Sequence, residues 1–217
     1  MTFRAALLLV PVALWAQSTT VVDNPIIKII NAVDRPHTPT PLHKHDFDRV
    51  MIYLDNGDQD ITIAGNVEHH HWKAGDVVWS PVGPEHVSEN VGPADLRIVE
   101  IEIKKPAPAT PPKRNPQLDP VAADRSHNTL LFENEHVRVF RNTLPVDGRE
   151  KWHEHVGAGR VVVLLTPVAA RVETATGDQS PMNGAPGDAL WREGPVAKHR
   201  GVNIGARPSE MILVEVK

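Results

Sequence analysis

The feature that most constrains the fold is an internal repeat, because short motifs of the first half of the chain return in the second half in the same order. The two copies end in similar strand-like segments, "LRIVEIEIK" at Lys104 and "EMILVEVK" at Lys217. Three further pairs of stretches align: "HKHDFDRVMIYL" (43–54) with "HEHVGAGRVVVLL" (153–165), "AGDVVWS" (74–80) with "PGDALWR" (186–192), and "HVSENVG" (86–92) with "HRGVNIG" (199–205). A repeat of this length predicts two similar folding units in one chain.

Each copy is built from short apolar runs that read as strands. The runs are rich in β-branched residues, as in "VMIYL", "DVVWS", "RIVEIEI", "VVVLL" and "MILVEV", and Gly, Pro, Asn and Asp separate them. No window has a long helical period, and 20 prolines and 14 glycines suit a loop-rich β protein. We therefore expect an all-β chain with two small barrels or double-sheet sandwiches.

A proline-rich stretch, "KKPAPATPPKRNPQLDP" from Lys104 to Pro120, separates the two copies. It is basic and poor in apolar residues, so it cannot pack a core and we expect it to run extended as a linker. We place the first unit at 18–105, the linker at 106–124 and the second unit at 125–217.

The first residues, "MTFRAALLLVPVALWAQ", have the pattern of a secretory signal peptide, with Arg4 before an apolar stretch and the small residue Ala16 after it. The apolar stretch has about 11 residues, too few to span a bilayer of roughly 30 Å as a helix. A first β-strand is the alternative, although Pro11 suits a strand poorly. We expect residues 1–17 to be a signal peptide and the mature protein to be periplasmic or secreted, without membrane association.

The composition excludes several classes of chemistry. The chain has no cysteine, so thiolate ligands, a cysteine nucleophile and disulfides are ruled out, and any metal must be bound through nitrogen or oxygen. The formal net charge of −4 gives no electrostatic reason to expect a nucleic acid partner. No nucleophile-with-base motif, phosphate-cradling glycine loop or dinucleotide fingerprint occurs, since G-x-S-x-G and G-x-G-x-x-G are both absent, so hydrolase and kinase functions have no support.

Two histidines at alternate positions, His43 and His45, precede the first long apolar run. Side chains at i and i+2 of a strand point to the same face, and His86 from a later strand can complete a set of three nitrogen ligands inside a barrel. Three ligands leave open coordination positions for other molecules. The second copy has the equivalent set, His153, His155 and His199. The alternative for each set is three solvated histidines at strand ends.

The segment "GDVVWSPVGPEHVSEN" resembles the second signature motif of the cupin superfamily, G-x5-P-x-G-x2-H-x3-N, at every specified position. Together with the upstream His-x-His, it makes the chain similar to a bicupin. The resemblance implies two double-stranded β-helix (jelly-roll) barrels in tandem, each with a site for a divalent metal ion. Cupins cover many activities, so the fold alone does not define the reaction.

The sequence departs from the cupin pattern where a glutamate usually supplies a fourth ligand. Arg49 stands at that position in the first copy and Arg160 in the second. Asp48 could become a carboxylate ligand if a bulge turned it inward. The preferred interpretation is a three-histidine site without the glutamate, which the resemblance allows for cysteine-dioxygenase-like and gentisate-dioxygenase-like cupins. An arginine beside such a site would hold an anionic substrate by its carboxylate.

These observations favour an exported bicupin metalloprotein that carries out dioxygenase-type oxidation of a small organic acid. Iron, manganese, nickel and zinc are the candidate ions, with Arg49 and Arg160 as catalytic residues that fix the substrate carboxylate. We expect a small anionic substrate as partner, no nucleic acid, and a homodimer. Two alternatives remain: a non-catalytic cupin that binds a small ligand or metal, and a metal-assisted isomerase or lyase that consumes no oxygen.

Three consecutive histidines in "EHHHWK" (68–73) are a weaker candidate site. Adjacent strand residues face opposite ways, so the three imidazoles cannot converge on one ion. We expect this stretch to be a solvated loop.

Overall fold

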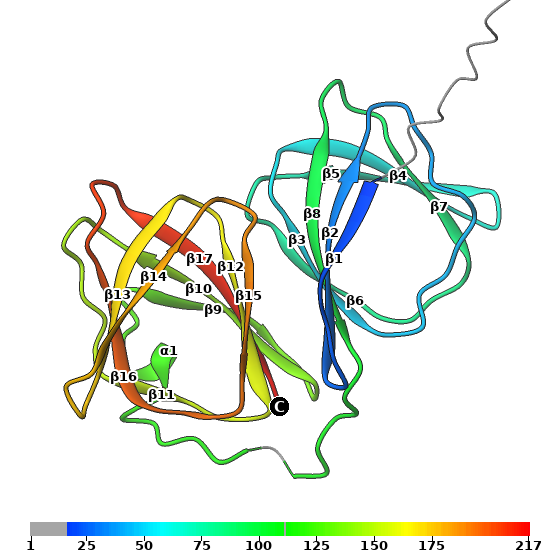
Figure 1. The fold of residues 1–217 in the computed structure, drawn as a ribbon. Helices are drawn as coiled ribbons and strands as arrows, with labels where there is room; N and C mark the ends of the chain where they lie inside the picture. Colours follow the sequence, from blue (N-terminus) through cyan, green and yellow to red (C-terminus); the bar gives the residue numbers. More distant parts are fainter. Residues whose placement is uncertain (1–16, 111) are drawn as a thin grey trace, which may run out of the picture.

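The computed structural model describes residues 17–110 and 112–217, and these residues form two β units (Figure 1). The predicted signal peptide lies outside the described residues except for Gln17, which begins the first strand. The strands of the first unit are β1 (Gln17–Asp23), β2 (Ile27–Asp34), β3 (Arg49–Tyr53), β4 (Gly57–Ile63), β5 (Asn66–Trp72), β6 (Val77–Ser80), β7 (His86–Asn90) and β8 (Leu96–Ile103).

The second unit repeats this order after a short helix, α1 (Pro120–Ala123). Its strands are β9 (Asn128–Glu133), β10 (Val137–Leu144), β11 (His153–His155), β12 (Gly159–Leu164), β13 (Val168–Thr174), β14 (Gln179–Gly184), β15 (Ala189–Glu193), β16 (Val196–Asn203) and β17 (Ser209–Val216). Among the described residues, no helix is long and apolar enough to cross a membrane.

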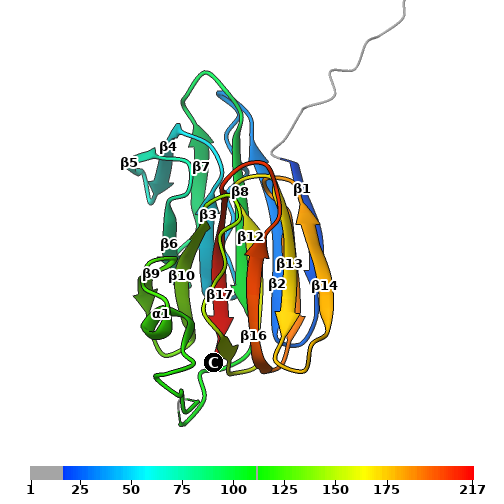
Figure 2. The ribbon, with the colours of Figure 1, turned by 90° about the vertical axis from the view of Figure 1, so that its left-hand side faces the viewer.

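Each unit is a pair of facing antiparallel sheets (Figures 1 and 2). The larger sheet has the order β1-β2-β8-β3-β6 in the first unit and β9-β10-β17-β12-β15 in the second, so the equivalent strands pair in the same way. The smaller sheets are β5-β4-β7 and β11-β16-β13-β14. This topology confirms the predicted all-β fold with two jelly-roll barrels in tandem.

The two faces of strand β3 have different roles, because one lines a cavity and the other packs in an apolar core. Arg49, Met51 and Tyr53 line a cavity inside the first barrel. Val50 and Ile52, at the alternate positions, face away from that cavity and have no exposed surface. The two faces of one strand therefore serve different purposes, as the period of two requires.

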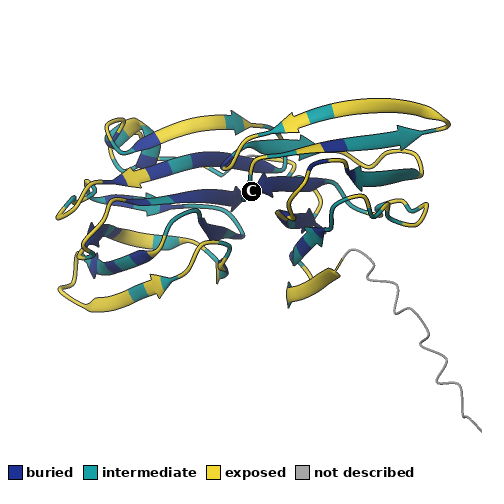
Figure 3. Cartoon of the chain, turned by 90° about the horizontal axis from the view of Figure 1, so that it is seen from above, coloured by how far each residue is buried: buried dark blue, intermediate teal, exposed yellow. Residues whose placement is uncertain are grey.

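The outward faces of the two larger sheets form one shared apolar core. The cluster joins buried residues of both units, including Ile29, Val50 and Ile52 of the first and Val161 and Val163 of the second. Figure 3 shows buried strands of both units meeting near the C-terminus. Burying each such side chain contributes roughly 1.5–3 kcal/mol, so this cluster stabilises the two units against each other. It also explains why the strands read as unbroken apolar runs rather than alternating ones.

The end of the proline-rich stretch is attached to the second barrel. Asp119 caps α1 by accepting hydrogen bonds from the backbone N–H groups of Val121 and Ala122. The same carboxylate is paired with Arg138 of β10 at 2.7 Å. Arg114 donates a hydrogen bond to Glu215 of β17 at 2.6 Å. These charged groups therefore hold the segment from Arg114 onward against strands β10 and β17 of the second barrel.

Candidate metal centres and cavities

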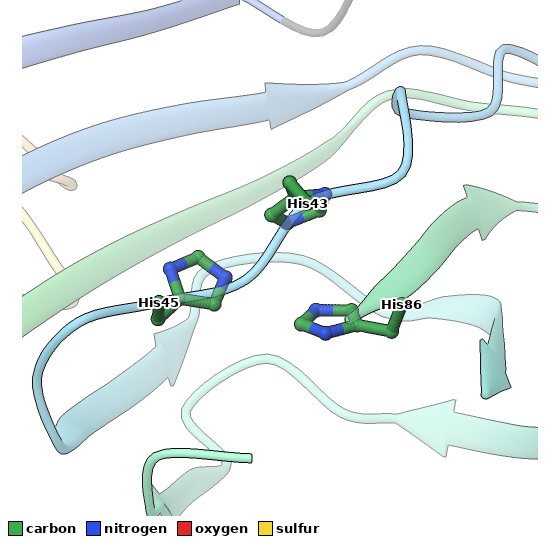
Figure 4. Close-up of side chains that lie close together, drawn as sticks. All are labelled: His43, His45 and His86. Atoms are coloured by element: carbon green, nitrogen blue, oxygen red, sulfur yellow. The ribbon is translucent and has the colours of Figure 1, made fainter. Parts of the chain in front are cut away.

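The first histidine triad converges at one end of the first barrel (Figure 4). His43 and His86 are held by two backbone hydrogen bonds of 3.0 and 2.8 Å between them, and His45 follows on the same face two residues later. The ring centroids of His43 lie 4.9 Å from His45 and 4.5 Å from His86. One nitrogen from each ring lies within 4.8 Å of the others, so a single ion could contact all three.

The second triad has the same geometry with deeper burial. His153 and His155 form β11, and His199 comes from β16, which pairs directly with it. The ring centroids of His153 lie 5.0 Å from His155 and 4.4 Å from His199. All three side chains are buried, whereas those of the first triad are half-buried.

Backbone carbonyls fix the tautomer of most of these imidazoles. A carbonyl oxygen only accepts, so the ring nitrogen beside it must carry the proton and the other nitrogen keeps its lone pair. Four Nδ1 atoms meet such an oxygen: His43 with Pro41 at 2.8 Å, His86 with Pro84 at 3.2 Å, His153 with Lys151 at 3.0 Å and His199 with Ala197 at 3.0 Å. Two rings of each triad therefore keep an Nε2 lone pair available to a metal ion.

Burial also favours the neutral form of four of these imidazoles, His45, His86, His155 and His199. It lowers the pKa of His45 to about 3, with a contribution from the positive charge of Arg49, and it lowers the pKa of His199 to about 3 with the help of neighbouring histidines. The pKa values of His86 and His155 are lowered for the same reason. Three neutral nitrogen donors fit a divalent ion such as iron, manganese, nickel or zinc.

The cavities beside the two triads differ in size. The first barrel encloses about 560 Å³ and the second about 220 Å³. The first has the size of cavities that hold organic ligands beside a metal, whereas the second lies below that size range and has room for about seven waters. The first barrel is therefore the candidate active site.

Arg49 lines the first cavity, and two of its three guanidinium nitrogens are hydrogen-bonded. Nη1 donates to Glu100 Oε2 at 2.7 Å, and Nη2 donates to Ser80 Oγ at 3.0 Å. Asp48 instead points away from the histidines, because its carboxylate accepts from the backbone N–H of Val82 at 2.7 Å. In this arrangement Arg49 faces the site and Asp48 does not supply a ligand.

Arg160 takes the equivalent position in the second cavity. Burial lowers its pKa to about 10, and its Nη1 atom is buried without a hydrogen-bond partner. The nearby Glu215 does not pair with it; its Oε1 lies 2.7 Å from His155 Nδ1. A carboxylate on the outer nitrogen of a ligating histidine orients the ring and raises its basicity.

Several cavity residues escaped the sequence analysis. Glu100 belongs to strand β8, which has apolar residues on both faces, and its pairing with Met51 across the sheet places it inside the barrel. The stretch expected to be a solvated loop is strand β5, and this corrects the expectation. His69 and His71 point outward to Asp60 and Asp58, while His70 lines the cavity.

Asn90 and Asn203 close the far ends of strands β7 and β16. Asn90 Nδ2 donates to the carbonyls of Asp34 and Ala94, both at 2.8 Å, and its Oδ1 accepts from Gly92 N. Asn203 makes the corresponding contacts in the second unit. These asparagines hold the loops together and do not reach the metal position.

No family model matches the chain, and no curated protein matches it in sequence. Solved structures do match. A cupin 2 conserved barrel domain protein from Leptotrichia buccalis is 14% identical over 94% of this chain and 90% of its own, with a TM-score of 0.56. AerE from Microcystis aeruginosa is 11% identical over 94% and 98%, with a TM-score of 0.62. Oxalate decarboxylase from Bacillus subtilis is 13% identical over 92% and 71%, with a TM-score of 0.63. At these identities the likeness establishes the fold alone, a tandem of two cupin-type barrels.

Proposed function

We propose that the chain is an exported, metal-dependent enzyme that oxidises a small organic acid with dioxygen in its first barrel. The observation that supports this most is the cavity of about 560 Å³ that joins the three histidines to buried charged groups. A cavity of this size suits an organic ligand rather than a metal alone. The dioxygenase-type reaction rests on the three-histidine donor set without a carboxylate.

The charge balance of the site favours an acid. Three neutral imidazoles leave the full +2 charge of a divalent ion without compensation, and a half-buried charge of this kind attracts an anion strongly. Arg49 adds a positive charge beside the histidines, and Glu100 balances that charge rather than the ion's. A substrate carboxylate would therefore neutralise the metal position.

The residues of this chain then have distinct roles. His43, His45 and His86 would hold the ion, and a redox-active ion such as iron or manganese would supply the electron transfer to dioxygen. Arg49, fixed by Glu100 and Ser80, would orient the substrate carboxylate through its remaining hydrogen-bonding capacity. Its Nε atom is buried without a partner.

The second barrel would hold an ion with a mainly structural role. Its cavity is small, its three histidines are buried, and His155 is fixed by Glu215. Arg160, which the sequence suggested as a second catalytic residue, would here balance buried carboxylates rather than contact a substrate.

The test combines metal analysis with oxygen uptake. We expect the purified protein to contain metal and to consume oxygen with small carboxylic acids, and His43→Ala/His45→Ala to lose the first-barrel metal and all uptake. The matched control, His153→Ala/His155→Ala, should lose only second-barrel metal and keep measurable uptake. Turnover without oxygen would favour an isomerase or lyase, and metal without turnover would favour a binding protein.

Export is a separate part of the proposal and rests on the sequence of residues 1–17. Expression of the full chain in a bacterium, followed by fractionation and mass determination, tests it. A periplasmic product that has lost about 17 residues supports export, and a cytoplasmic product that begins at Met1 contradicts it.

A further inference from the structure

The first cavity contains a second group of polar residues that the metal site does not use. Asp34, Tyr53, Gln59 and Trp72 all line it. Asp34 is 7% exposed and Gln59 is 4% exposed, so these are buried polar side chains in a largely apolar part of the barrel. Buried polar groups are costly unless they are hydrogen-bonded.

The hydrogen bonds within this group fix the direction of each donor. Trp72 Nε1 can only donate, and it lies 3.1 Å from Gln59 Oε1, which also accepts from the Tyr53 hydroxyl at 3.4 Å. The amide group of Gln59 must therefore turn its Nε2 toward Asp34, where it donates to Oδ2 at 2.8 Å. The Asp34 carboxylate is therefore the final acceptor in this series of hydrogen bonds.

Asp34 retains unused acceptor capacity. Among the described residues, Gln59 is the one hydrogen-bond donor to its carboxylate, and a carboxylate offers about four lone-pair positions. Burial raises the pKa of Asp34, while the bond from Gln59 lowers it. A further donor that entered the cavity would therefore relieve an under-bonded buried acid.

The second barrel shows that the fold does not need this network. Strand register makes Leu144, Leu164, Ala170 and Gly184 the equivalents of Asp34, Tyr53, Gln59 and Trp72. All four are apolar or lack a side chain, yet the second barrel has the same topology. The polar group of the first barrel is thus additional to what folding requires.

The network lies away from the histidines along the barrel. Ile63 pairs with His86, and Gln59 lies four residues further along the same strand. At 3.3 Å per residue this separation is about 13 Å. With the metal level with Ile63 and the Asp34 carboxylate level with Gln59, allowing about 2 Å for a metal–oxygen contact and about 3 Å for a hydrogen bond leaves about 8 Å for the ligand itself.

We propose that Asp34, held by Gln59, forms a second subsite in the first barrel that binds a hydroxyl or ammonium group of the substrate while its carboxylate occupies the metal position. This deepens the proposed function and rests on it for the carboxylate end. The substrate class is an organic acid with a hydrogen-bond donor about 8 Å from its carboxylate. A two-carbon acid is too short to reach both ends.

The test measures the binding of matched acids to the metal-containing protein by isothermal titration calorimetry. One pair is 3-(4-hydroxyphenyl)propanoate and 3-phenylpropanoate, and the other is 6-aminohexanoate and hexanoate. We expect one donor-bearing acid to bind about ten- to a hundredfold more tightly than its partner, the range for a hydrogen bond to a charged group. The pair that shows the preference identifies the donor as hydroxyl or ammonium.

Asp34→Asn keeps an acceptor for Gln59 and loses the charge, and Asp34→Ala removes the acceptor altogether. Both variants should reduce the preference at least about tenfold, whereas Glu68→Gln, a carboxylate that lines the same cavity, should keep it. If Asp34→Ala does not fold, Asp34→Asn decides the outcome.

Equal affinities within both pairs, no binding of any probe, or a preference that persists in Asp34→Asn would overturn the subsite. Oxygen uptake is measured separately on the same protein. Its absence with the preference intact would refute the oxidation and leave the subsite standing.

Discussion

Replacing Ile52 with alanine should destabilise the whole chain, not only the first barrel. Ile52 has no exposed surface and belongs to the apolar cluster that both units share. Truncation of a buried isoleucine to alanine costs about 2–5 kcal/mol, through lost burial and the cavity left behind. At about 2–4 °C per kcal/mol for a chain of this size, a loss of about 3 kcal/mol lowers the midpoint of thermal unfolding by roughly 6–12 °C.

Differential scanning calorimetry distinguishes a shared core from two independent ones. We expect one cooperative transition for the wild type and one for Ile52→Ala, shifted as a whole. Val67→Ala, at a side chain that is 48% exposed on the far sheet of the same barrel, is the control and should change stability by no more than about 0.5 kcal/mol. Two separate wild-type transitions, of which Ile52→Ala moves only one, would refute the argument.

Three further predictions concern charged and titrating groups. Arg49→Ala should cost about 3 kcal/mol in urea unfolding because it leaves Glu100, whose side chain is only 15% exposed, without its partner, and adding Glu100→Leu should recover much of that loss. A double variant no more stable than Arg49→Ala would contradict the pairing. In the metal-free protein, the lowered pKa of His199 means that the unfolded chain binds more protons below pH 6.5, so His199 alone should lower the free energy of unfolding by about 2 kcal/mol between pH 6.5 and 5. Chemical denaturation at several pH values should show a fall that is smaller by about this amount in His199→Gln, where His45 and the other histidines with lowered pKa values still contribute. Glu215→Gln should weaken metal binding in the second barrel about 10–100-fold, whereas Glu102→Gln, at the equivalent position of the first, should leave metal content unchanged in both barrels.

The repeat and the turn residues were enough to predict two all-β jelly-roll units, because strand periodicity and motif order are local properties of the sequence. The histidine triads could also be expected from spacing, since His43 and His45 share a face wherever the strand runs. The structure brings both triads together as that spacing indicates.

The rest of the cavity could not be predicted, because both faces of the larger sheet are buried. In "RIVEIEI" apolar residues occupy both parities, so nothing local says that Glu100 faces inward while Ile101 faces the second unit. The network joins Asp34 of β2 to Gln59 and Trp72 of the β4–β5 hairpin and corresponds to no motif. The single-residue alternation of β5 was hidden by three identical histidines in a row.

The shared apolar core restricts which residues the two copies can have at outward-facing positions, but not at inward-facing positions. At outward positions Val50 and Val161 are identical, and Ile52 and Val163 differ by one methylene, because each must fit the neighbouring barrel. At inward positions the copies diverge as far as Asp34 and Leu144 without loss of the fold. In such a chain, substitutions inside one barrel can change its chemistry, while the outward-facing residues of both barrels keep the two units packed together.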